Sequence, residues 1–191
     1  MKQQTVLVAV VVLAMGLIAD RLGCLRYRGS DHEIFDQKPA MVTSVIDGDT
    51  VRIRRGPADD EVPVRLLGID APEMNYRTDS PPEHFAEQAT LYLRSRVEGR
   101  SVILKLEPLE TRDRYDRLLA YLYPTPNENL NLTMVRDGQV YADRRFNHTY
   151  RAQFEQAENE ARHAGRGLWK SVRIEQMPEW RQRWRQQSSA N

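Results

Sequence analysis

Residues 64–73 join an apolar run to three charged side chains, and this stretch constrains the fold of the chain more than any other. The run is interrupted only by Arg65, which is typical of a buried strand with one charged side chain pointing into a site. Asp70, Pro72 and Glu73 follow, and the proline keeps the chain extended where the strand ends. One cation and two carboxylates at the end of a rigid element indicate a functional site, although a strand with a solvated end would show the same pattern.

The segments around this strand predict a small mixed domain. Runs of β-branched residues at 41–46 and 50–54 flank Asp47-Gly48-Asp49 and predict a hairpin with glycine in its turn. Alternating apolar residues predict further strands at 101–106 and 118–123.

Helix signals lie between and after these strands. Ser80, followed by two prolines and a glutamate, has the form of a helix N-cap, and Gly99 provides the stop. A short helix fits residues 129–137, and a last one begins near Asn147 or Thr149 and ends at Gly165. Five strands with a helix after the third and helices after the fifth predict a mainly β, α+β fold. The expected architecture is a five-stranded OB-type Greek-key barrel with three helices, preceded by a hydrophobic N-terminal segment.

The N-terminal segment has the composition of an export signal. Residues 5–19 are uncharged and almost wholly apolar, so residues 1–24 are expected to be a signal peptide or a membrane anchor. Its 17 uncharged residues at 3–19 are near the short limit for crossing a bilayer. The segment matches the small-residue pattern of a signal-peptide cleavage site only poorly, which favours an uncleaved anchor. We therefore expect an exported, membrane-anchored domain outside the cytoplasm, or a secreted one if the segment is cleaved, with residues 25–38 as a polar linker.

Charge and cysteine content narrow the possible functions. There are 28 Lys and Arg against 27 Asp and Glu, a net charge of +1, so any polyanion site must be a local concentration of arginine. The single Cys24 excludes an internal disulfide and a multi-cysteine metal site. Residues 171–191 form a basic tail rich in Trp and Arg. Its Trp180 could contact nucleic acid or lipid, or could pack on the barrel.

Three clusters need a common explanation: residues 47–50, residues 65–73 and residues 113–117. Carboxylates without Cys or His suit Ca²⁺ or Mg²⁺. Arginines suit phosphate, because their planar forks match its oxygens. Carboxylates, a divalent ion and two arginines are the groups needed to hydrolyse a phosphodiester.

The motifs at residues 45–51, 65–73, 113–121 and 165–169 occur in the order seen in the staphylococcal (thermo)nuclease family, which the chain resembles over about residues 38–169. The resemblance implies an OB barrel with three helices, placed here at residues 39–170. It implies a calcium-dependent nuclease that cuts DNA and RNA with low sequence specificity, prefers single-stranded or frayed substrates, and acts as a monomer.

The resemblance also implies a role for each motif residue. Metal ligands would be the carboxylates of Asp49 and Asp70 and the backbone carbonyl of Ala71, where the family often has Thr. Glu73 would orient or activate the attacking water. The arginines would be divided between the scissile phosphate, held by Arg65 and Arg117, and a neighbouring phosphate, contacted by Arg114 with Tyr115.

Two aspartates near the motif residues, Asp116 and Asp47, are not expected to bind the metal ion. Asp116 stands where the family commonly has Gly, which places an anion beside the phosphate site; Asp tolerates a left-handed backbone better than most residues. Asp47 is expected to support its turn by hydrogen bonding rather than to bind metal. The alternatives to an enzyme are a nucleic-acid-binding or protein-interaction module on the same barrel, with or without a membrane anchor.

Overall fold

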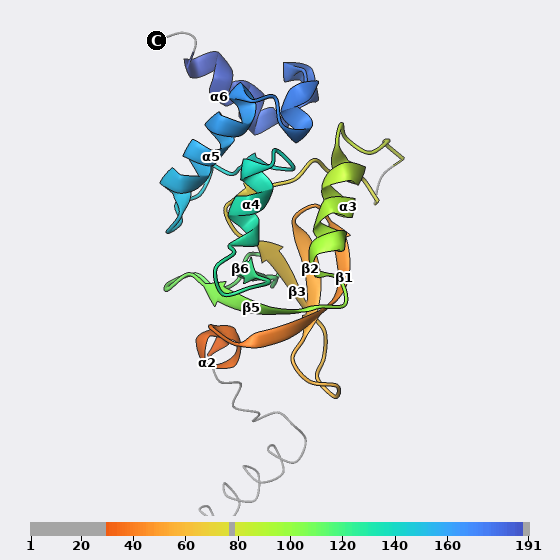
Figure 1. Ribbon diagram of the computed structural model, residues 1–191, viewed down its shortest axis with the longest axis vertical. Helices are drawn as coiled ribbons and strands as arrows, with labels where there is room; N and C mark the ends of the chain where they lie inside the picture. Colours follow the sequence, from red (N-terminus) through yellow and green to blue (C-terminus); the bar gives the residue numbers. More distant parts are fainter. Residues whose placement is uncertain (1–29, 77–78, 189–191) are drawn as a thin grey trace, which may run out of the picture.

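A closed barrel of five strands forms the centre of the protein (Figure 1). The computed structural model describes residues 30–76 and 79–188. The strands close in the order β1-β2-β3-β6-β5, with β3 and β6 parallel and the other pairs antiparallel. Their bounds are β1 Pro39–Asp47, β2 Thr50–Arg54, β3 Val62–Leu66, β5 Ser101–Leu106 and β6 Leu118–Tyr123. The predicted fold class is confirmed.

Alternation of side chains produces this barrel. In β5, Val102, Leu104 and Leu106 are buried, and the residues between them are not. Successive side chains of a strand point to opposite faces, so every second residue enters the barrel core. The pairing of β2 with β3 places Thr50 opposite Arg65, which brings the hairpin turn next to the central strand.

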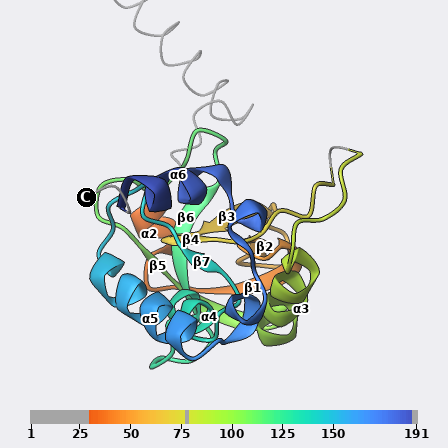
Figure 2. The same ribbon diagram turned by 90° about the horizontal axis from the view of Figure 1, so that it is seen from above.

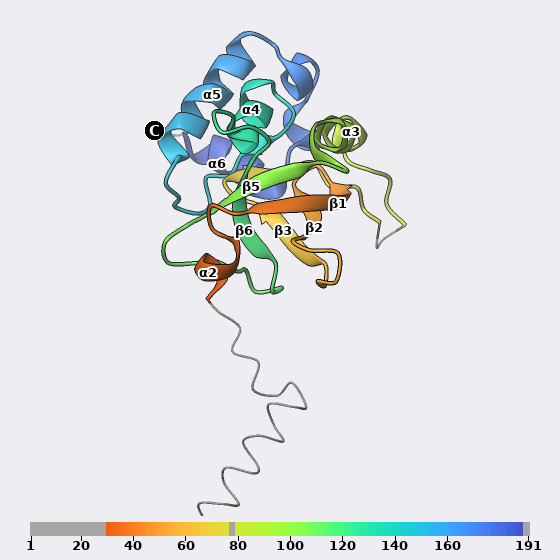
Figure 3. The same ribbon diagram turned by 60° about the horizontal axis from the view of Figure 1, so that its bottom comes forward.

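Three helices lie at one end of the barrel (Figures 1 and 3). Helix α3, Ala86–Val97, packs on β1; α4, Leu130–Arg136, packs on β6; and α5, Arg151–His163, packs on α4. Asn129 caps α4 as its pattern predicted, because its side chain accepts a hydrogen bond from the Leu132 amide at 3.2 Å. Helix α5 begins slightly later than expected, with Tyr150 as its N-cap.

The predicted start of α3 at Ser80 is wrong. The helix begins at Ala86, after Phe85 in a left-handed conformation with φ of 74°. Glu83 does not reach back to cap the helix: its amide donates to the Glu73 carbonyl at 2.9 Å, and its Oε2 accepts from the Glu73 amide at 3.0 Å. These bonds tie the segment before α3 to the strand end that carries Glu73.

A second, two-stranded sheet was not predicted. Strand β4, Ile69–Asp70, pairs with β7, Tyr141–Ala142, and Asp70 lies opposite Tyr141. Two residues are too few to show an alternating pattern. This small sheet nevertheless fixes the backbone of Asp70.

Both ends of the described chain carry further helices. Part of the expected linker forms α2, Asp31–Phe35, which begins with a capping box between Ser30 and Glu33 and buries Phe35. The 3₁₀ helix η1, Gly167–Lys170, ends the expected domain, and the expected tail contains a second one, η2 Ile174–Gln176, followed by α6, Glu179–Ser188. In Figure 2, α6 lies over the end of the barrel near β4 and β7.

The predicted signal or anchor at residues 1–24 lies outside the described residues. Within residues 30–76 and 79–188, no helix has the length and apolar character needed to cross a membrane.

Candidate active site

The turn between β1 and β2 is held close to the end of β4. A Cβ atom on Gly48 would lie 2.7 Å from Cβ of Ala71 and 2.9 Å from Cβ of Ala89, so only glycine allows this approach. Asp47 accepts a hydrogen bond from the Asp49 amide at 3.1 Å, in the turn-supporting role expected for it. Oδ2 of Asp49 accepts from the Ala71 amide at 2.8 Å. The turn therefore brings Asp49 beside the Asp70 segment.

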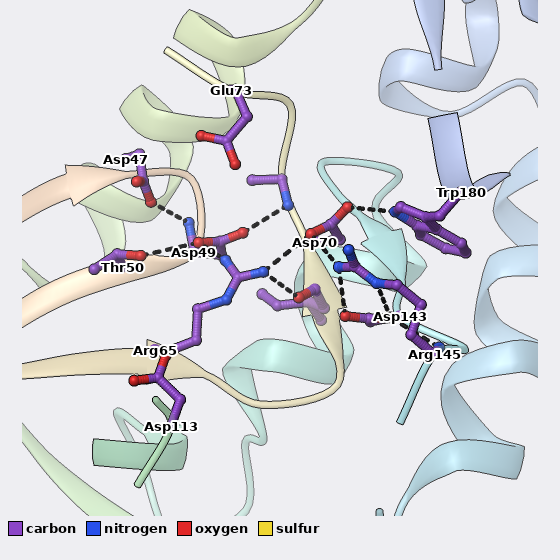
Figure 4. A network of polar contacts seen from close by, with 12 residues as sticks. Asp47, Asp49, Thr50, Arg65, Asp70, Glu73, Asp113, Asp143, Arg145 and Trp180 are labelled. Carbon is purple, nitrogen blue, oxygen red and sulfur yellow. Dashed lines mark hydrogen bonds and ion pairs between the residues drawn. The ribbon is translucent and has the colours of Figure 1, made fainter. Parts of the chain in front are cut away.

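Arg65 of β3 connects the two aspartates (Figure 4). Its Nη1 contacts Oδ1 of Asp49, and its Nη2 lies 3.0 Å from Oδ1 of Asp70. Its side chain is only 16% exposed, and burial lowers the pKa of the guanidinium. An arginine remains charged despite such a shift. One cation thus joins the two carboxylates that were predicted to bind metal.

Asp70 has two further partners from later in the chain. Nη2 of Arg145 lies 2.7 Å from its Oδ1, and Nε1 of Trp180 donates to its Oδ2 at 2.9 Å. Arg145 is itself held by Asp143, with 2.8 Å between Nη2 and Oδ2. Both oxygens of the Asp70 carboxylate are therefore oriented by neighbouring side chains.

Glu73 turns its carboxyl group toward the turn that carries Asp47 and Asp49 (Figure 4). Although much of the residue is exposed, partial burial of the carboxyl group raises its pKa, and the charge of Asp47 raises it further. Arg65 opposes this rise. A carboxylate with a raised pKa is a better proton acceptor, which suits a general base.

The loop before β6 supplies the remaining predicted residues. Arg117 pairs with Asp113, with 2.7 Å between Nε and Oδ2. Burial raises the pKa of Asp47 and lowers that of Arg65, and Arg117 lies close enough for its charge to oppose the first shift and add to the second. The guanidinium of Arg114 lies 4.7 Å from the ring centre of Tyr115, and both residues are exposed. The loop therefore places one arginine at the carboxylates and an exposed arginine–tyrosine pair beyond it.

Asp116 adopts the left-handed conformation, with φ of 61°. Its carboxylate pairs with Arg112 at 3.3 Å rather than with Arg117, and its side chain is 82% exposed. The turn is thus accommodated by Asp, and the anion closest to Arg117 is Asp113.

The donor set fits a divalent cation with oxygen ligands. Asp49 and Asp70 offer carboxylate oxygens and Ala71 a backbone carbonyl, which are donors that Ca²⁺ accepts. Among the described residues, no group of three His, Cys, Asp or Glu side chains is arranged to hold a metal ion. Burial raises the pKa of Asp47. Burial is also the main cause of the raised pKa of Glu73, and the charge of Arg65 opposes the rise at both carboxyl groups.

Arg145 and Trp180 were not predicted to contribute to the site. The sequence signals were the Asp143-Arg144-Arg145 charge cluster and the Trp180-Arg181 pair in the tail. Neither signal indicates which distant carboxylate these side chains contact.

Comparison with known proteins gives a consistent result. The family model described as staphylococcal nuclease homologue matches residues 63–171. "Probable endonuclease LCL3" of Schizophyllum commune is 32% identical over 142 residues, which are 67% of this chain and 47% of that protein. "Thermonuclease" of Staphylococcus intermedius is 31% identical over 132 residues, 68% of this chain and 74% of that protein.

An "Uncharacterized endonuclease" of Escherichia coli O157:H7 is 31% identical over 139 residues, 73% of this chain and 80% of that protein. The chain spans about half the length of the fungal relative and about three quarters or more of the two bacterial ones. The barrel, the site and these matches agree: the chain belongs to the staphylococcal nuclease family.

Proposed function

We propose that this protein is a calcium-dependent nuclease that hydrolyses DNA and RNA with low sequence specificity, preferring single-stranded or frayed substrates. Nuclease activity itself is supported by family membership and by relatives named endonuclease or thermonuclease. The observation that carries the finer proposal is the contact of Arg65 with both Asp49 and Asp70, below the carboxyl group of Glu73.

Each side chain has a defined task in this proposal. Asp49, Asp70 and the Ala71 carbonyl would hold Ca²⁺, which accepts oxygen ligands in flexible geometry. The bound ion would supply Lewis-acid stabilisation of charge on the phosphoryl oxygens. Arg65 would exchange part of its contact with the aspartates for the phosphate, whose oxygens match its planar fork.

The arginines would stabilise the charge that develops as water attacks phosphorus. Glu73 would take the proton from that water as the new P–O bond forms, and the leaving oxygen would depart with the electron pair of the broken P–O bond and take a proton from solvent. Arg117 contacts the same phosphate, and Arg114 with Tyr115 contacts a neighbouring one. A non-catalytic binding module would not require Glu73 to face the turn that carries Asp49.

The test is cleavage of a single-stranded DNA oligonucleotide by purified protein in Ca²⁺ or in EGTA, with wild type and Glu73→Gln. We expect no cleavage in EGTA. The variant should lose about 10²–10⁴-fold in kcat, the usual contribution of general acid–base catalysis. Binding of a nucleotide should be nearly unchanged, because the lost interaction belongs to the transition state.

Glu87→Gln, an exposed change in the first turn of α3, is the matched control and should retain wild-type activity. Full activity in EGTA would refute the calcium proposal. A loss below about threefold for folded Glu73→Gln, against the 10²–10⁴-fold expected, would remove Glu73 from the mechanism.

We also propose that the protein is exported and attached to a membrane by residues 1–24, with the nuclease domain outside the cytoplasm as a monomer. The support is the uncharged apolar run at residues 5–19. Cell fractionation and size-exclusion chromatography test both points. A mature N-terminus near residue 17 or 20 would instead establish a cleaved signal and a free enzyme.

A further inference from the structure

The last helix of the described chain reaches the active site. Trp180 of α6 donates its indole N–H to Oδ2 of Asp70 at 2.9 Å (Figure 4). The match to the family model ends at residue 171, and α6 follows it in the chain. A helix that follows the matched segment therefore contacts a carboxylate at the centre of the candidate site.

A buried ion pair anchors this helix. Arg181 is 1% exposed, and its Nη2 lies 2.6 Å from Oε2 of Glu158, which is fully buried in α5. The Arg181 guanidinium carbon also lies 5.0 Å from the ring centre of Tyr141 and 5.1 Å from that of Trp169. Separating a charge buried in this way from its partner is costly, so the ion pair favours this orientation of α6.

The same anchor supports the backbone of Asp70. Oε1 of Glu158 accepts a hydrogen bond from the Ala142 amide at 3.0 Å. Ala142 belongs to β7, whose Tyr141 is paired with Asp70 of β4. Glu158 thus connects α6 to the strand pair that carries Asp70, while Trp180 contacts the side chain of the same residue.

Trp180 differs chemically from the other partners of Asp70. Arg65 and Arg145 are cations and share Oδ1. An indole has one donor and no charge, so it orients Oδ2 without neutralising the carboxylate. The ring of Trp180 also lies 4.9 Å from the Arg145 guanidinium, which restricts where Arg145 can lie.

We propose that Trp180 is a positioning residue: it holds the Asp70 carboxylate in the orientation that binds the metal ion, and α6 is thereby an integral part of the active site. This inference rests on the proposed role of Asp70 as a calcium ligand. Partners that orient metal ligands usually contribute about 10–100-fold to metal affinity or activity when removed singly.

The experiment compares Trp180→Phe with Trp169→Phe in the full chain. Both changes remove one indole N–H and keep an aromatic ring, but Nε1 of Trp169 is buried and has no hydrogen-bond acceptor among the described residues. Calcium affinity is measured by titration calorimetry without substrate. Cleavage of one oligonucleotide is then measured over a range of Ca²⁺ concentrations, and thermal unfolding checks that each variant is folded.

We expect Trp180→Phe to bind Ca²⁺ about tenfold more weakly or worse, and to regain much of its lost activity at high Ca²⁺. A purely structural defect would not be rescued by the ion. Trp169→Phe should match wild type in calcium affinity. The wild-type protein gives a second readout: the indole ¹⁵N–H resonance of Trp180 should shift on Ca²⁺ addition, with the midpoint found by calorimetry.

Two results would overturn the inference while leaving the proposed function intact: Trp180→Phe binding Ca²⁺ as tightly as wild type, or binding it more tightly because the indole competes with the ion. Wild-type protein that binds no Ca²⁺ at all would instead refute the calcium proposal, and the positioning role with it.

Discussion

Replacing Arg181 by Met should destabilise the protein strongly, although Arg181 lies in the last described helix and not in the barrel. Arg181 is 1% exposed and its partner Glu158 is fully buried, so the change leaves a buried carboxylate without its closest cation. Removing one partner of a buried ion pair commonly costs about 3–5 kcal/mol of the free energy of unfolding. Here Glu158 keeps Arg144 at 3.0 Å and the Ala142 amide. We therefore expect the lower end of that range, about 3 kcal/mol.

Thermal and urea unfolding, followed by circular dichroism, measure this loss. A loss of about 3 kcal/mol corresponds to a decrease in Tm of about 6–12 °C for a domain of this size. The matched control is Arg183→Met on the same helix, whose pair with Glu179 spans 3.8 Å between side chains that are 70% and 87% exposed. Such surface pairs contribute little, so the control should unfold close to wild type.

A double variant separates a buried charge from lost packing. In Arg181→Met with Glu158→Gln, the amide oxygen can still accept the Ala142 amide and the buried carboxylate charge is gone, while Arg144 exchanges its ion pair with Glu158 for a hydrogen bond to a neutral amide. We expect the second change to recover about 1 kcal/mol or more of the loss. Equal stability of Arg181→Met and the Arg183→Met control would refute the buried pair. Failure of the second change to recover any stability would show that packing, not charge, is responsible.

Three further predictions concern the phosphate loop and the α3–α4 contact. Arg117→Lys should lower kcat/KM at least about tenfold, because a lysine cannot make the two-pronged phosphate contact; wild-type kcat/KM would show that this loop does not bind the scissile phosphate. Asp116→Gly removes an exposed anion paired with Arg112 and relieves the strain of a left-handed backbone, so stability should be nearly unchanged. Its kcat/KM should rise modestly at low ionic strength and match wild type at high salt. A slower variant would mean that Asp116 supports the site. Burial and the hydrogen bond to Asp137 raise the pKa of Tyr92 to about 12. The stability that this hydrogen bond provides below about pH 10 should therefore be lost as the pH rises toward 12, and Tyr92→Phe should flatten this part of the stability–pH curve. An unchanged slope would show that Tyr92 does not link α3 to α4.

The barrel and its helices could be predicted because their signals are local. Alternation in residues such as Val102, Leu104 and Leu106 predicts a strand without reference to the rest of the chain. The start of α3 could not be predicted from the Ser-Pro-Pro-Glu sequence at residues 80–83, which commonly begins a helix. Here its glutamate, Glu83, hydrogen-bonds to the backbone of Glu73 instead. A contact ten residues away in sequence overrides the local preference.

The candidate site shows the same division. The structure brings together four predicted site residues that lie in or next to strands predictable from the sequence: Asp49, Arg65, Asp70 and Glu73. The role of each was suggested by family motifs rather than by periodicity. The contact of Trp180 could not be predicted in this way, because it joins Trp180 to Asp70, 110 positions away in the sequence.

Arg181 gives a physical reason why that distant contact can be specific. Successive residues of an α-helix point about 100° apart, so a small rotation of α6 would turn Trp180 away from Asp70. Apolar packing is non-directional and distinguishes such rotations weakly. A rotated helix would separate the buried Arg181 from Glu158 and leave Glu158 only its second cation, Arg144, which costs several kcal/mol. The ion pair therefore selects one rotation of α6, and in that rotation the neighbouring Trp180 directs its N–H at the carboxylate of Asp70.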